Sequence, residues 1–210
     1  SGIPVSVNLD TLNITDSFYI DNFSTRFVSD SINGTFAGLF MGAEPVTGSF
    51  GSENGYRFAE ILSNDAGAFL QAAGLIKRGA EGKLNLRINR NADGIKGRLF
   101  TESLKIYDLP ALAKLLQSLS IIGLLEQMLG QGLFLSESEI NFRLDDKQYI
   151  IDRASFFGPS LGISLDGYLN RKDRLLDFQG VFSPIYAINS IGSVLTRKGE
   201  GLIGINFDLW

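Results

Sequence analysis

The feature that most constrains the fold is a repeated alternation of apolar and polar residues, interrupted by glycine-containing turns. Successive side chains of a β-strand point to opposite faces, so a period of two predicts strands with one apolar face. The alternation is clear in residues 84–89, 140–145, 161–169, 176–182 and 203–209, and weaker in 5–9, 18–28, 35–40, 56–62 and 97–106. The connections are too short for repeated parallel crossovers. The sequence therefore predicts a mainly β protein built on one long antiparallel sheet.

Three segments depart from the period of two and predict helices near 64–74, 109–129 and 184–195. The first begins at a cap, Ser63 or Asn64, continues with apolar residues at helical spacing and meets Gly74 at its end. The third begins at Ser183 and Pro184. These amphipathic segments are expected to pack on the sheet or to cap it.

The middle helical segment, 109–129, has the widest apolar face. Its length approaches the ~20 residues that span a bilayer, but Lys114 and Glu126 would be costly inside one. We expect this helix to pack on the sheet, to lie on a membrane surface or to close the end of an apolar groove. The residues expected to make that contact are Leu112, Leu116 and Leu119.

The chain contains no histidine and no cysteine. Their absence excludes Ser/His/Asp and Cys/His catalytic sites, cysteine or histidine zinc sites, and disulfides. The remaining enzyme class is a hydrolase that uses carboxylates alone, which needs two buried acids facing one cleft. Aspartates such as Asp145 and Asp166 fit solvated turns better than a metal site. The sequence therefore predicts a protein that is not an enzyme and has no metal or cofactor.

Charge gives two further expectations. The formal net charge is −4, so nucleic acid is not an expected partner. Residues 77–98 nevertheless hold seven basic and two acidic side chains, and Arg87 falls on the polar phase of its strand. This stretch is interpreted either as a solvated outer face of the sheet or as a surface that attracts phosphate head groups.

Several segments, in this order, resemble the C-terminal region of AsmA-like proteins of the TamB and YhdP type. The resemblance spans about residues 58–210. The first 55 residues share only a similar succession of strands and turns. No single segment is diagnostic alone, and the order carries the likeness. The matching segments are SNDAGAFL (63–70), LPALAKLL (109–116), GLL (123–125), GPSLG (158–162), DGY (166–168), SPIY (183–186) and GEGLIG (199–204).

The resemblance implies a Gram-negative envelope protein that is anchored in the inner membrane and carries a long curved sheet in the periplasm. The concave face of such a sheet is apolar, and these proteins pass phospholipids toward the outer membrane or otherwise maintain it. The family pattern holds no catalytic residues. We expect residues 1–210 to be a single β-rich segment of a longer protein, whose anchor lies outside this sequence.

The alternation itself leads to a compatible hypothesis. An antiparallel sheet usually turns one apolar face inward, and either helices or acyl chains could cover that face. We predict that one row of inward residues contacts acyl chains: Ile140, Phe142, Leu144, Ile163, Leu165, Phe178, Ile205 and Phe207. Alternatively, these residues form an ordinary core sealed by the helices. A different alternative is a structural or partner-binding module that assists outer-membrane protein assembly through an exposed strand edge.

Overall fold

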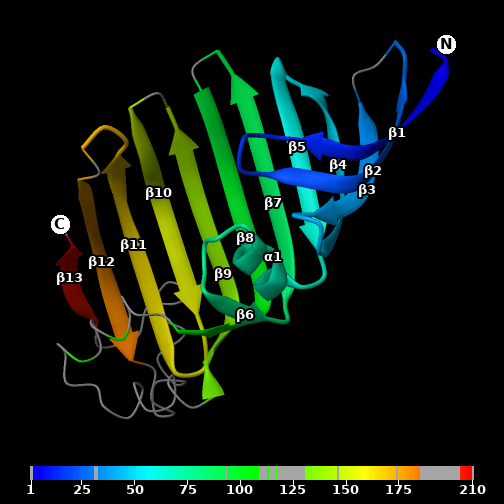
Figure 1. Ribbon diagram of the computed structural model, residues 1–210. Coiled ribbons are helices and arrows are strands. Elements are labelled where there is room, and N and C mark those ends of the chain that lie inside the picture. Colours follow the sequence, from blue (N-terminus) through cyan, green and yellow to red (C-terminus); the bar gives the residue numbers. More distant parts are fainter. Residues whose placement is uncertain are drawn as a thin grey trace.

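The structure, a computed structural model, describes residues 2–30, 33–92, 94–108, 113, 117, 131–145, 147–173, 175–184 and 204–209. Thirteen strands form one antiparallel sheet, and nearly every strand pairs with its neighbours along the chain (Figure 1). The short strand β6 lies off this path and pairs with β8. The predicted mainly β fold with one long antiparallel sheet is confirmed.

The described strands and the helix α1 have the following bounds. They are β1 (Pro4–Asn13), β2 (Tyr19–Val28), β3 (Gly34–Phe40), β4 (Glu44–Glu53), β5 (Tyr56–Ser63), α1 (Ala66–Ala72), β6 (Arg78–Ala80), β7 (Lys83–Asn91), β8 (Gly94–Tyr107), β9 (Leu133–Leu144), β10 (Gln148–Phe157), β11 (Leu161–Asn170), β12 (Leu176–Pro184) and β13 (Ile205–Leu209). The alternation did not predict β4, β6 or β10, and it placed the start of β9 seven residues too late, at residue 140.

The helix α1 confirms the first predicted helix, with a corrected cap. Its N-cap is Asp65, whose side chain accepts a hydrogen bond from the backbone N–H of Ala68 at 2.9 Å. Ser63 instead ends β5 and donates from Oγ to Glu44 Oε1 at 2.6 Å. Gly74 follows the helix with φ +70, so the predicted glycine stop is confirmed.

The other two predicted helices fall largely outside the described residues. Of the range 109–129 the structure describes Ala113 and Gln117, both with helical backbone, so Leu112, Leu116 and Leu119 lie outside it. Of the range 184–195 it describes Pro184. The predicted helix start at Ser183 and Pro184 is wrong, because both residues belong to β12 and pair with β11.

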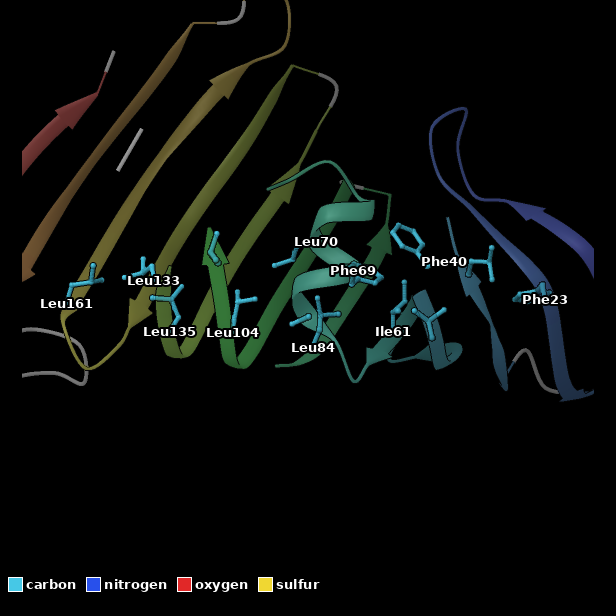
Figure 2. Packing of buried hydrophobic residues seen from close by; sticks show 14 of the residues in the cluster. Phe23, Phe40, Ile61, Phe69, Leu70, Leu84, Leu104, Leu133, Leu135 and Leu161 are labelled. Atoms are coloured by element: carbon cyan, nitrogen blue, oxygen red, sulfur yellow. The ribbon is translucent and has the colours of Figure 1, made fainter. Parts of the chain in front are cut away.

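The hydrophobic core lies on the side of the sheet that α1 covers (Figure 2). Phe69 of α1 stacks on Phe40 of β3, with ring centroids 4.4 Å apart. From this contact a band of buried side chains crosses the sheet toward Leu161 and Phe182, both fully buried. The helix therefore seals one portion of a much wider apolar surface.

The opposite side of the sheet is polar, and exposed ion pairs link its strands to one another. Arg143 forms two hydrogen bonds to Asp152 from its Nε atom at 2.8 Å, and a third from Nη2. Because both members of such a pair remain exposed, each pair stabilises the fold by only ~0.2–1 kcal/mol.

Candidate functional site: the apolar face of the sheet

The strand register brings the predicted apolar residues onto one face. Residues directly opposite each other in an antiparallel pair point to the same side. Ile140 of β9 lies opposite Ala154, and Ala154 lies opposite Leu165. Leu165 in turn lies opposite Gly180, which lies opposite Phe207 of β13. One row of same-facing positions thus crosses five strands.

Neighbouring rows contain the rest of the predicted set. Ile163 lies opposite Phe182, which lies opposite Ile205. The remaining residues enter two further rows, Phe142–Ile151–Gly167–Phe178 and Leu144–Tyr149–Leu169–Leu176. All eight predicted residues therefore share one side of the sheet, which we call the apolar face. Whether they contact lipid stays a prediction.

The apolar face continues from β9 toward β1. Leu99 of β8 lies opposite Ile140 and also opposite Leu86 of β7, which lies opposite Ile61 of β5. The same-facing positions then pass through β4 to Phe36 of β3. The surface is thus a property of the whole sheet and not of its C-terminal half.

Two irregularities keep apolar side chains on this face. The register of β10 shifts between Ile151 and Ala154, so both residues can face the same side although three positions separate them. In β8, Ser103 has φ +57, and Thr101 and Leu104 on its two sides line the same pocket. Without these two irregularities, the strict alternation of a β-strand would place the following apolar side chains on the polar side of the sheet.

The predicted residues are less buried than the core, although Ile163, Ile205 and Phe207 pack against it. All eight are half-buried, whereas Leu133, Leu135, Leu161 and Phe182 are buried. Leu176, on the same face, is 39% exposed. Within the part of the chain that the structure describes, the apolar face is therefore buried along a band that runs from α1 to Leu161 and Phe182, and it is partly accessible outside that band.

A pocket of about 410 Å³ lies between residues 70–76 and strands β8 to β11. Leu70, Leu75 and Ile76 line one side of it, and the sheet lines the other. Of the predicted site residues, Ile140 and Ile163 line this pocket and the other six do not. No charged residue contributes to the lining described here, so the pocket suits an apolar chain.

Two hydroxyl groups are the polar side chains of this pocket. Thr101 is 2% exposed and Ser138 is 5% exposed, and the register places them directly opposite each other. Thr101 Oγ1 and Ser138 Oγ have no hydrogen-bond partner among the described residues. The alternation pattern did not identify either residue, because it separates apolar from polar positions and gives no sign that a hydroxyl is buried.

The basic stretch lies partly on the polar face and is partly neutralised there. Arg87 Nη2 forms an ion pair with Glu53 Oε2 at 2.9 Å, and Arg98 Nε with Glu139 Oε1 at 2.8 Å. The hydrogen bond from Arg98, followed by one from Asn141, lowers the pKa of Glu139, and the same bond to Glu139 raises the pKa of Arg98. For Arg87 and Arg98 these contacts favour the solvated-face interpretation. Attraction of phosphate groups by the stretch stays a prediction.

The acidic side chains of the described residues do not form the pair that a carboxylate hydrolase needs. A second pocket, of about 560 Å³, lies on the polar face and is lined by Asp152, Asp166 and Asp208, all of which are exposed. Glu44 is the one buried acid in the described part of the chain, and it accepts the hydrogen bond from Ser63. The described residues also contain no group of three acids placed to hold a metal ion.

Within the described ranges, no helix has the length and hydropathy needed to cross a membrane. Comparison with family models, with curated proteins and with solved structures gives no match to this chain.

Proposed function

We propose that this chain is a lipid-handling segment of a Gram-negative envelope protein. In this proposal it supports phospholipid transport between the inner and outer membranes, and with it outer-membrane integrity, through an apolar groove. It acts in the periplasm as part of a protein anchored in the inner membrane, and it catalyses no reaction. The observation that carries the proposal is the continuous apolar face, whose eight predicted residues are half-buried and lie on one side of the sheet.

The energetics of such a surface suit acyl chains. Each buried methylene contributes ~0.8 kcal/mol, so a chain gains affinity along an apolar path without any specific polar contact. Contiguous apolar surfaces that remain accessible commonly mark binding sites. Transport along such a face needs a continuous apolar path and no chemical step.

The test places a charge on the face away from α1. Phe142→Asp puts a carboxylate among half-buried apolar residues, where it is partly solvated but opposes an acyl chain. We expect the variant to remain folded and to retain roughly tenfold less phospholipid, measured by native mass spectrometry, because a penalty near 1.4 kcal/mol changes binding tenfold. Ile163→Arg repeats the test inside the pocket.

Asn89→Asp is the control for an added carboxylate, because the register places Asn89 opposite Lys96 on the polar face of the sheet. Circular dichroism and resistance to protease report the fold. The proposal is wrong if the wild-type chain retains no phospholipid, or if Phe142→Asp retains as much as Asn89→Asp. Unfolding of Phe142→Asp, together with absent lipid in the wild type, would instead support a sealed core.

The alternative function, a partner-binding module for outer-membrane protein assembly, is favoured by one observation. The strand β1 pairs with β2 along its whole length, and no described strand pairs with its other edge. Such an edge offers a row of backbone N–H and C=O groups to an incoming strand. This function uses the edge of the sheet and the first uses its face, so different substitutions separate them.

A further inference from the structure

We infer that the Thr101 and Ser138 hydroxyls bind the uncharged oxygen group of an acyl-ester lipid inside the pocket on the apolar face. This inference rests on the proposed function, because it assigns a specific polar contact to a surface proposed to hold acyl chains. It depends on two independent features of the described residues: a pocket without charged lining and a pair of buried hydroxyls without a partner.

The position of the hydroxyls within the pocket determines what kind of ligand fits. Along β8, Thr101 lies between Leu99 on one side and Leu104 on the other. Along β9, Ser138 lies between Leu135 and Ile140. A ligand that reaches both hydroxyls therefore meets apolar side chains in both directions along the strands. It needs an apolar body with one hydrogen-bonding group within it, as in an acyl ester.

The uncharged lining and the volume of the pocket restrict further which ligands can bind. A buried unpartnered hydroxyl costs about as much as a lost hydrogen bond, and a carbonyl oxygen that accepts from it removes that cost. A carboxylate would be costly because no cationic side chain is among the lining residues that the structure describes. A single water occupies ~30 Å³ and cannot fill a pocket of about 410 Å³, which lies within the range of small-molecule sites, roughly 300–1,000 Å³.

The experiment compares two uncharged lipids that differ in one carbonyl group. Monopalmitoylglycerol is an ester, and hexadecylglycerol is its ether analogue with the same head group and no carbonyl oxygen. Each is delivered to the full 210-residue chain from cyclodextrin, and the dissociation constant is measured by titration. We expect the wild type to bind the ester about fivefold more tightly, the net effect of one neutral hydrogen bond.

The double variant Thr101→Val with Ser138→Ala removes both hydroxyls and keeps the shape of the pocket. It should bind the two lipids equally, with an affinity close to that of the wild type for the ether. Ser183→Ala is the matched control, because Ser183 is also buried with an unpartnered Oγ but does not line the pocket. This control should keep the fivefold preference.

Thermal unfolding without lipid gives a second readout. Thr101→Val should be at least as stable as the wild type if its hydroxyl has no partner, and less stable if a partner already satisfies it. A destabilised Thr101→Val, or equal wild-type affinity for ester and ether, overturns the hydroxyl assignment and leaves the proposed function standing. Failure of the wild type to bind either lipid overturns the assignment together with the proposed function.

Discussion

Glu139 shows how single residues hold the polar face together. Its Oε1 accepts hydrogen bonds from Arg98 Nε at 2.8 Å and from Asn141 Nδ2 at 3.1 Å. The bond from Arg98 is the main cause of its lowered pKa. A carboxyl whose pKa is lower in the folded state contributes its full stabilisation above the unfolded value, about 4.3 for glutamate. That contribution declines as the pH falls through the folded-state pKa.

Glu139→Gln tests this account. We expect the substitution to lower the free energy of unfolding at pH ~7 by at most about 1 kcal/mol, because the ion pair is exposed. At pH ~2 the difference from the wild type should approach zero, since the wild-type carboxyl is then protonated as well. Urea unfolding at both pH values measures the two differences. Asp177→Asn, at an exposed acid of the same face, serves for comparison, and a difference that does not change with pH contradicts the prediction.

At the same scale, sequence reasoning identified the apolar residues of the candidate site but not its hydroxyls. Ile140, Ile163 and Phe207 follow from alternation, because one period fixes the side of every residue in a regular strand. Thr101 and Ser138 occupy positions of the same face and are buried where residues 70–76 lie over the sheet. That cover joins distant parts of the chain, and the period of one strand carries no information about it.

Among the elements, α1 covers one part of the apolar face, and Gly67 determines how closely α1 approaches. The backbone N–H of Gly67 donates to the carbonyl of Glu81 at 3.1 Å, and that of Ala66 donates to Gly82 at 2.8 Å. A Cβ atom at Gly67 would collide with the backbone of Ala80. The first turn of α1 therefore rests directly on the segment that includes β6.

Gly67→Ala should consequently destabilise the protein. Because backbone atoms oppose the added methyl group, we expect a loss of about 1–3 kcal/mol in the free energy of unfolding, measured in urea. Gln71→Ala is the control on the same helix: Gln71 is exposed, and its Oε1 accepts a long 3.3 Å bond from Gly79. That control should lose less than ~0.5 kcal/mol. Equal stability of Gly67→Ala and the wild type would show that α1 does not depend on this close approach.

Two strands that the alternation did not predict, β4 and β10, also have physical explanations. The strand β4 contains Pro45, Gly48 and Gly51, residues that usually indicate turns, and its neighbours β3 and β5 hold it in place. In β10, the register shift after Ile151 breaks the period of two within the strand. Tertiary pairing in the first case and a bulge in the second override the local pattern that the predictions used.

At the scale of the whole molecule, the open sheet leaves the outer edge of β1 as a surface for strand pairing. The ten residues of β1 include one proline, Pro4, at the start, and no lysine or arginine, the residues that commonly discourage pairing at an edge. On the polar side of this strand, Ser6 and Asn8 are exposed and lie opposite Arg26 and Ser24 of β2. Apart from Pro4 and the exposed Asp10, the strand therefore lacks the usual protection against an added partner.

We expect the chain to self-associate through this edge in a concentration-dependent way, and we expect Ser6→Lys with Asn8→Lys to weaken that association severalfold. The two lysines would place charge along the edge without altering the apolar face, so a change in association could not come from lost apolar contact. Sedimentation velocity over a range of concentrations measures the effect. Thr47→Lys with Ser49→Lys is the control, because these residues lie on the polar side of β4, which is paired on both edges. Association that persists in the β1 variant, or that falls equally in the β4 variant, would show that the molecules meet through another surface, and the apolar face would then be the surface to test.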